Sequence, residues 1–339
     1  MVKYMDENTT NHSKIGLIIR GAAMGVAEVI PGVSGGTIAF ITGIYQDLIQ
    51  SVSSVDHTTV VDLFRFRISK IWKKINGPFL LYLIIGMVIG VISGVFGVTK
   101  LLESSPEILW GFFFGLIVAS IPLMFGQMKN RTVMHVIPFL ICAIIAYIVT
   151  SISPAENSSN YLYIFFAGMI AISAFVLPGI SGSFILLLMG LYTLIIPTIK
   201  SFLESPSGEE FIILAVFGLG CIAGLAVFSR IVSAAFKNYH DITIAAMTGF
   251  MFGSLNKIWP WRNPDILLDK ESGQNIEGES IQAYLNSATH DGFKIIQESN
   301  VLPNGYLNDP ITGYVIVAFI IGLIIVGGMY FTQKGSSTP

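Results

Sequence analysis

The sequence predicts an all-α polytopic membrane protein whose two halves are related as an inverted repeat. Its 339 residues are 53% hydrophobic and only 12% charged, and soluble domains average about 25% charged residues. A short stretch rich in proline, glycine and serine also occurs twice within apolar sequence, 147 residues apart. Because these residues break helices, we expect each half to contain a re-entrant or broken helical hairpin and three transmembrane helices.

The duplicated stretch spans Ile30 to Thr37 in the first half and Leu177 to Phe184 in the second. The similarity extends to Gly43–Tyr45 and Gly190–Tyr192, so that seven of the fifteen paired positions starting at Pro31 are identical. Weaker matches pair glycines elsewhere, namely Gly86 with Gly220, Gly90 with Gly224 and Gly115 with Gly253. A helix broken at membrane depth once per half is typical of a transporter's binding site.

The boundaries of the two halves follow from the apolar runs, since about 20 residues are needed to cross the hydrocarbon. The first half, 1–153, contains a broken hairpin at 15–50, a basic interfacial helix at 60–75 and spans at 78–99, 107–127 and 133–152. The second half, 154–339, contains a broken hairpin at 160–199, spans at 209–229, 242–259 and 310–332, and a loop at 260–309. Each hairpin is expected to consist of two apolar pieces, 15–30 with 37–50 and 160–177 with 182–199. A re-entrant arrangement is favoured because the turns contain no charged residue, and two tilted full crossings are the alternative.

Charge placement predicts the orientation. With both termini in the cytoplasm of a bacterial cell, 13 of the 19 lysine and arginine residues fall on the cytoplasmic side of the inner membrane, as the positive-inside rule requires. The loop 260–309 is then outside. Three spans per half is an odd number, so the second half enters the membrane upside down relative to the first.

Residues 60–75 place apolar side chains at helical spacing between five basic residues. This pattern is typical of a helix that lies on an anionic leaflet, and we expect anionic membrane lipids as its partner. A solvated basic linker is the alternative.

The two turns have the composition of an anion site. Ser34 and Ser181 stand where helix N-caps belong, and the glycines that follow leave backbone amides uncovered at a positive helix end. A phosphate or a carboxylate is the ligand that this arrangement favours, although close helix packing would also use small residues. The candidate binding residues in the turns are Pro31, Gly32, Ser34, Gly35, Gly36, Thr37, Pro178, Gly179, Ser181, Gly182 and Ser183.

Two charged residues complete the predicted site. Glu28 and Arg20 lie in the apolar run before the first turn, whereas Phe175 and Ala167 occupy the equivalent positions of the second half. Ionisable groups at this depth are costly and usually functional. Arg20 would bind a phosphate and Glu28 would carry a coupling proton; alternatively, the two side chains pair as a structural bridge.

A serine enzyme is disfavoured although residues 32–36 match Gly-x-Ser-x-Gly, because none of the five histidines lies near either turn and the nucleophile needs a base within reach. The two cysteines, Cys142 and Cys221, lie in separate apolar spans, so no disulfide or metal site is predicted. We expect no cofactor and no nucleic-acid partner.

The chain resembles the bacterial polyprenyl-phosphate (undecaprenyl-phosphate) translocase family. The resemblance rests on residues 21–37 and 177–192 and extends over about 15–260 and the last span. It implies a carrier, not an enzyme, that returns undecaprenyl phosphate from the outer to the cytoplasmic leaflet for cell-envelope synthesis. Coupling to protons or another cation would offset the cost of moving an anion into a negative interior.

Two alternatives remain. One is a membrane enzyme resembling undecaprenyl-diphosphate phosphatases, which also have inverted halves with Pro-Ser-rich turns. That family has a histidine after one turn and an arginine in the other, where this chain has Thr37 and Gly182. The other is a small-anion secondary transporter.

Overall fold

The computed structural model describes residues 13–30, 33–130, 132–152, 160–269, 275–277, 281 and 293–335. Pro31 and Gly32 of the first turn lie outside this set, as does part of the loop 260–309. The described chain is mainly helical, and four helices are long and apolar enough to cross a membrane: Gly77–Gly97, Pro106–Gly126, Val133–Ser151 and Gly208–Asn238. The predicted class, an all-α polytopic membrane protein, is confirmed.

Each predicted hairpin contains three helices. In the first half these are α1 (Lys14–Val29), α2 (Gly35–Ile41) and α3 (Tyr45–Ser53). In the second half they are α9 (Tyr161–Val176), α10 (Gly182–Leu188) and α11 (Tyr192–Glu204). The expected single pieces 37–50 and 182–199 are therefore wrong, because each contains a second break. At seven residues each, α2 and α10 rise only about 10 Å, which is too short to cross the hydrocarbon.

The second break has the same cause in both halves. Gly43 and Gly190 have φ angles of +74° and +70°, a left-handed conformation that glycine adopts without strain. The next amides reach back five residues, from Ile44 to Ala39 and from Leu191 to Leu186, both at 3.0 Å. This is the Schellman ending of a helix, and the repeated Gly-x-Tyr was its signal in the sequence.

The remaining membrane helices follow the predicted order. They are α6 (Gly77–Ser104), α7 (Pro106–Gly126), α8 (Val136–Ser151), α12 (Gly208–Asn238), α13 (His240–Ser254) and α15 (Thr312–Gly335). The 3-10 helix η1 (Val133–His135) leads into α8, and η2 (Pro303–Gly305) precedes α15. α12 continues nine residues beyond the expected end at 229, and α13 has 15 residues where the sequence predicted a span at 242–259.

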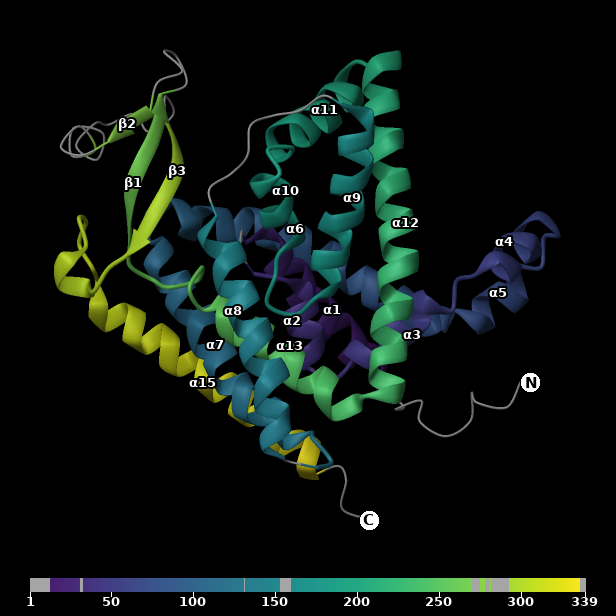
Figure 1. The fold of residues 1–339 in the computed structure, drawn as a ribbon, viewed down its shortest axis with the longest axis horizontal. Helices are drawn as coiled ribbons and strands as arrows, with labels where there is room; N and C mark the ends of the chain where they lie inside the picture. The colour runs from purple at the N-terminus through teal and green to yellow at the C-terminus, as the bar shows by residue number, and fades with distance from the viewer. Residues whose placement is uncertain are drawn as a thin grey trace.

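Helix packing follows a two-fold pattern (Figure 1). α1 packs along α6 as α9 packs along α12, and α7 packs along α15 as α13 packs along α8. A β-carbon at Gly86 would overlap the carbonyl oxygen of Ile18, and one at Gly220 would overlap that of Phe165. Ile18 and Phe165 are 147 residues apart, the same offset as the duplicated turns. Small residues therefore let equivalent backbones approach closely.

The second helix pair shows the same correspondence. Gly115 of α7 faces the carbonyl of Phe319 in α15, and Gly253 of α13 faces that of Ala143 in α8. The glycines that the sequence paired are thus located at equivalent helix contacts.

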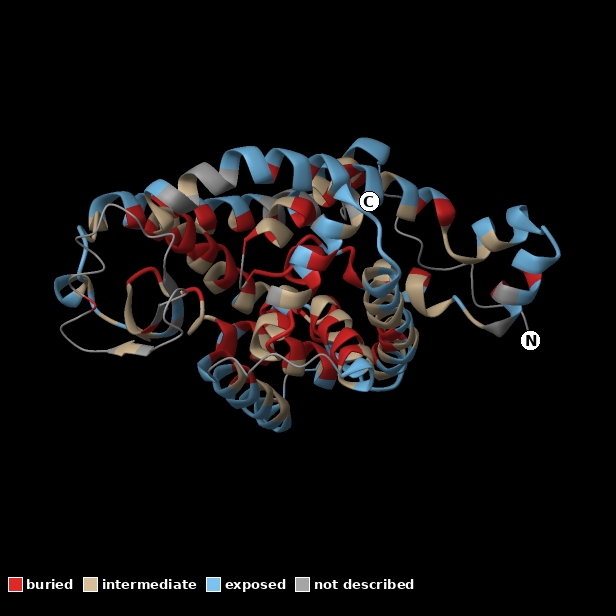
Figure 2. Ribbon diagram, turned by 90° about the horizontal axis from the view of Figure 1, so that it is seen from above, coloured by how far each residue is buried: buried red, intermediate tan, exposed pale blue. Residues whose placement is uncertain are grey.

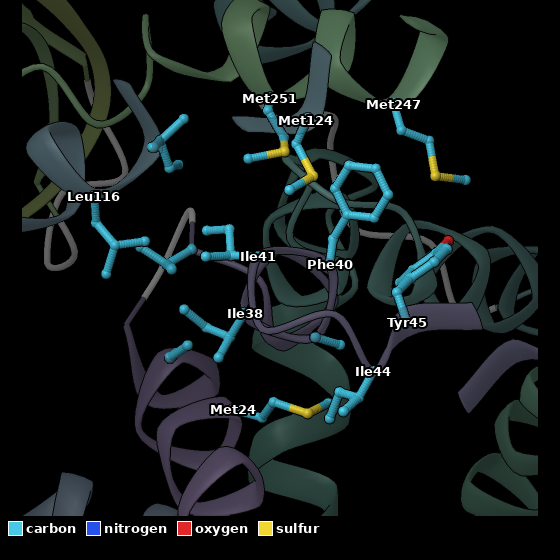
Figure 3. Packing of buried hydrophobic residues seen from close by; sticks show 14 of the residues in the cluster. Met24, Ile38, Phe40, Ile41, Ile44, Tyr45, Leu116, Met124, Met247 and Met251 are labelled. Carbon is cyan, nitrogen blue, oxygen red and sulfur yellow. The ribbon is translucent and has the colours of Figure 1, made fainter. Parts of the chain in front are cut away.

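The short helix α2 lies in the middle of the molecule, and all seven of its residues are buried. Figure 2 shows buried residues concentrated at the centre, with exposed residues on the outer helices. Ile38, Phe40 and Ile41 pack in one cluster with Met124 of α7 and Met251 of α13 (Figure 3). The first hairpin therefore forms much of the protein's core.

The predicted helix at 60–75 is wrong in one respect, because it is two helices: α4 (His57–Phe64) and α5 (Ile68–Lys74). The break lies at Phe66, which has a φ of +53°. Asp56 caps α4 in a capping box with Thr59, and Lys74 of α5 binds the same carboxylate at 2.5 Å. The side chains of Lys74 and Thr58 hold the pKa of Asp56 below its usual range. Helices α4 and α5 extend away from the other helices (Figure 1).

The loop 260–309 contains a small sheet, which the all-α prediction did not include. β1 (Arg262–Asp269) is the central strand, flanked by β2 (Asn275–Glu277) and β3 (Phe293–Asn300), and both pairings are antiparallel. Leu267 pairs with Ile276 on one side and Ile295 on the other. The sheet stands at one end of the molecule, at the start of α15 (Figure 1).

Hydrogen bonds join the connecting segments into two groups at opposite ends. At the first end, Asp241 of α13 accepts from the amides of Lys129 (3.0 Å) and Asn130 (2.8 Å). Arg230 of α12 donates to the carbonyl of Val55, which follows α3, at 2.6 Å.

At the second end, Asn256 after α13 donates to Ser151 of α8 at 3.2 Å. Tyr306, which precedes α15, donates to Glu107 at the start of α7. Each of these contacts joins segments that the predicted topology assigns to the same side.

Candidate functional site

The two turns contact each other through direct hydrogen bonds. The amide of Gly179 donates to Thr37 Oγ1 at 2.8 Å. Ser34 Oγ lies within hydrogen-bond distance of the carbonyl oxygens of Phe175 (3.3 Å) and Leu177 (3.5 Å). Segments more than 140 residues apart in the sequence thus form one polar centre.

Glycine allows this approach at two positions. A β-carbon at Gly36 would lie 2.9 Å from the carbonyl oxygens of Phe175 and Val176, closer than packed atoms tolerate. Gly179 has a φ of +90°, and a β-carbon there would also lie 2.7 Å from the backbone of Met251 in α13. The turn glycines therefore serve both backbone conformation and close packing.

Both turn serines are N-caps, which confirms the prediction from their positions. Ser34 Oγ accepts from the amide of Gly36 at 3.1 Å, and Ser181 Oγ accepts from that of Phe184 at 3.4 Å. Ser181 Oγ also lies 2.9 Å from Ser183 Oγ. The caps are alike, but Ser34 reaches across to the other turn whereas Ser181 bonds within its own.

Glu28 reaches the first turn from the end of α1. Its Oε1 accepts a hydrogen bond from the amide of Gly35 at 2.5 Å. Gly35 is the first residue of α2. The Glu28 carboxylate therefore accepts from a backbone amide that the sequence analysis assigned to the substrate. A side-chain anion thus holds the position expected for a phosphate oxygen.

Arg20 lies farther from the turns. It precedes Glu28 by eight residues on the same helix, a rise of about 12 Å, and it is in the field of Asp47 at the start of α3. The structure brings Glu28 to the first turn. The alternative of a bridge between Arg20 and Glu28 stays a prediction.

The centre is closed in this structure. Ser34 and Thr37 are each 1% exposed and Ser181 is 2% exposed. Pro178, Gly179 and Gly182 are buried as well, while Ser183 is partly exposed. A ligand would reach these amides only after the two turns separate or Glu28 moves.

Sequence reasoning missed the carbonyls of Phe175 and Leu177, because backbone groups carry no residue-type signal. Two further polar residues near the second break of the first hairpin contact other groups. Thr42 Oγ1 bonds the carbonyl of Ile38 within its own helix at 2.7 Å, and Gln46 lies 3.5 Å from His240.

Comparison with known proteins agrees with this picture. Residues 24–276 match a family described as VCA0040-like, undecaprenyl phosphate translocase-like. The chain is 38% identical over 258 residues to a polyprenyl-phosphate transporter of Vibrio cholerae serotype O1, which covers 76% of this chain and 82% of that protein. It is 31% identical over 265 residues to a polyprenyl-phosphate transporter of Staphylococcus aureus, covering 74% and 88%.

No solved structure matches the chain. The family match spans both turns, all of α2 and α10 and the four long apolar helices. The chain therefore belongs to the undecaprenyl phosphate translocase-like family.

Proposed function

We propose that this protein carries undecaprenyl phosphate from the outer to the cytoplasmic leaflet of the bacterial inner membrane. The proposal is supported by the family and by the names of its relatives. The observation that carries it is the hydrogen-bonded contact between Thr37 and Gly179, because it joins two turns rich in backbone donors at the centre of an apolar helical body. The isoprenoid tail stays in lipid, so only the headgroup needs a polar path.

The proposed headgroup site is formed by the two turns, with Glu28 as its proton carrier. Glu28 and a phosphate oxygen compete for the amide of Gly35, which the carboxylate holds at 2.5 Å. Protonation weakens the carboxyl group as an acceptor and releases the amide to the substrate. Moving one negative charge into a negative interior costs about 2.3 kcal/mol per 100 mV, and an accompanying proton removes that cost.

The proposed topology is an inverted repeat of 1–153 and 154–339, with re-entrant hairpins and both termini in the cytoplasm. Three observations support it. Equivalent helices make equivalent contacts, α2 and α10 are too short to cross the membrane, and hydrogen bonds join segments expected on the same side. The bond from Arg230 to Val55, for example, links two cytoplasmic segments.

Reconstituted transport tests the function. Labelled undecaprenyl phosphate in proteoliposomes should leave the outer leaflet faster with the protein than without it, and faster still when the outside is acidic. Arg20→Gln should slow transport, while Lys129→Gln, which removes an exposed lysine away from the turns, should not. Release of inorganic phosphate from undecaprenyl diphosphate would favour the phosphatase, and equal uptake of free phosphate would favour a small-anion transporter.

We also propose that α4 and α5 lie on the anionic cytoplasmic leaflet. Phe64 is 80% exposed, Phe66 88% and Ile68 54%, and five basic residues lie between 65 and 74. Asp62 and Asp56 neutralise part of this charge by pairing with Lys70 at 2.9 Å and with Lys74 at 2.5 Å. The remaining cations suit an acidic lipid surface, where each is worth about 1 kcal/mol.

Hydrogen exchange in nanodiscs tests this contact. Amides 57–74 should exchange more slowly in discs that contain phosphatidylglycerol than in purely zwitterionic discs. Lys73→Gln should reduce the difference, whereas Lys129→Gln should leave it unchanged. Equal exchange in the two lipids would mean that the segment is a solvated linker.

A further inference from the structure

A polar pocket lies at the end of the molecule that carries the sheet. Its volume is about 360 Å³, and its walls come from the end of α8, the segment after α13, and strands β1 and β3. Amide and hydroxyl groups form much of the lining, including Thr150, Ser151, Asn256 and Asn300. Nothing in the turn site uses these residues.

Two cations in the pocket share a single carboxylate oxygen. Glu298 Oε2 lies 2.9 Å from Arg262 Nη1 and 3.5 Å from Lys257 Nζ. These side chains are mostly buried, at 11% exposed for Arg262, 25% for Lys257 and 23% for Glu298. The guanidinium also stacks on Trp110 at 4.9 Å. One carboxylate oxygen therefore contacts two partly desolvated cations.

The other nearby carboxylates have their own donors. Asp265 accepts from Ser299 Oγ at 2.8 Å, and Glu107 accepts from the hydroxyl of Tyr306. Arg262 Nε, by contrast, is buried and has no hydrogen-bond partner among the described residues. A buried guanidinium donor without an acceptor indicates that the group is arranged for an anion with more oxygens than Glu298 offers.

The pocket adjoins the second turn. Lys257 Nζ lies 5.0 Å from the ring centroid of Phe184, and the amide of Phe184 is the one that Ser181 caps. An anion held by Lys257 would therefore lie beside the start of α10.

We propose that this pocket binds a phosphate monoester, with Lys257 and Arg262 as its cations and Glu298 as an internal counter-ion that the phosphate displaces. A phosphate offers Lys257 and Arg262 several oxygens where Glu298 offers them one, and guanidinium binds phosphate bidentately. This inference rests on the proposed function and deepens it: on the predicted topology the pocket faces outward, and it loads the lipid headgroup before the headgroup reaches the turns.

Calorimetry on the full chain in detergent tests the site, with inorganic phosphate and geranyl phosphate as separate ligands. Lys257→Gln should weaken binding about tenfold, the equivalent of one charge-assisted hydrogen bond, and Glu298→Gln should strengthen it by removing the competitor. Binding of geranyl phosphate that weakens in Lys257→Gln identifies a lipid headgroup site, and binding of inorganic phosphate alone identifies a free-phosphate site. Lys129→Gln is the matched control, and thermal unfolding checks that each variant is folded.

The proposal is overturned if folded Lys257→Gln binds both ligands as the wild type does, or if Glu298→Gln weakens binding. The same titration on Glu28→Gln separates this result from the transport proposal. Loss of transport in Glu28→Gln with unchanged phosphate binding supports two sites. Normal transport in Lys257→Gln with lost phosphate binding would retain the carrier and reject the loading role.

Discussion

The two turns share a sequence but differ in their surroundings. The first leads into α2, whose seven residues are all buried in the largest core cluster, and it receives the carboxylate of Glu28. The second leads into α10, of which only Gly182, Phe184 and Leu186 are buried. Phe175 stands there in place of Glu28. The duplication thus supplies a matched backbone, while one charged side chain distinguishes the two halves.

This difference indicates a division of roles. The first turn is fixed by core packing and carries the ionisable group, and the second turn is closer to the surface and to the polar pocket beside Lys257. Substitutions at equivalent positions therefore test whether the asymmetry matters, because each half supplies the control for the other.

The largest effect is expected at Glu28. Glu28→Gln should lower the transport rate tenfold or more, roughly the loss of one charge-assisted interaction, and should abolish the stimulation by an acidic exterior. Phe175→Gln, the matched change in the second turn, should leave the pH dependence intact. If transport by Glu28→Gln still responded to pH, a group other than Glu28 would carry the coupled proton.

The contact between the turns is the next most sensitive feature. Thr37→Val removes the acceptor of the Gly179 amide and leaves a buried donor unsatisfied, so the free energy of unfolding should fall by about 1–3 kcal/mol. Denaturation in detergent measures the change. Thr42→Val serves as control, because Thr42 bonds a carbonyl of its own helix, and its effect should stay within about 0.5 kcal/mol. Equal effects would mean that the cross-turn bond contributes nothing.

The two caps should differ by a smaller amount. Ser34→Ala loses a cap and the contacts to the opposite turn, and should lower the free energy of unfolding by up to about 2 kcal/mol. Ser181→Ala loses a longer cap bond of 3.4 Å and should cost nearer 0.5 kcal/mol. Thermal unfolding of the two variants measures both losses of stability. A larger loss for Ser181→Ala than for Ser34→Ala would contradict the difference between the two turns.

The two helix endings should not differ. Gly43→Ala and Gly190→Ala each force alanine into a left-handed conformation, which costs about 1–2 kcal/mol. Because both glycines end equivalent helices with the same bond pattern, the two losses of stability should agree closely. A clear difference in unfolding temperature would show that the surroundings, and not the turn itself, set the strain.

Much of this protein is predictable from short-range features of the chain. Apolar composition predicted the membrane helices, and the spacing of Ser34 and Ser181 before small residues predicted their N-caps, because a cap depends on a few adjacent residues. The matched glycines Gly86 and Gly220 indicated equivalent helix contacts, because small residues allow two helix backbones to approach closely.

Other features depended on contacts between distant segments. The sheet formed by β1 to β3 was missed, since its strands are weak signals in a loop rich in polar residues. The break at Phe66 was missed although it is local, because it needs a left-handed backbone that phenylalanine rarely adopts. The pairing of Lys257, Arg262 and Glu298 was also invisible, because these residues lie up to 41 positions apart and meet only when β3 aligns with β1.

The sequence by itself determined that the chain enters a membrane, contains one duplicated turn and carries a single carboxylate beside the first copy. Only the tertiary structure decided that Thr37 bonds Gly179, that Glu28 holds the amide of Gly35, and that Ser34 reaches the carbonyl of Phe175. The physical reason is that helix breaks and caps arise from neighbouring residues, whereas the partner of a buried polar group depends on which distant helix packs against it.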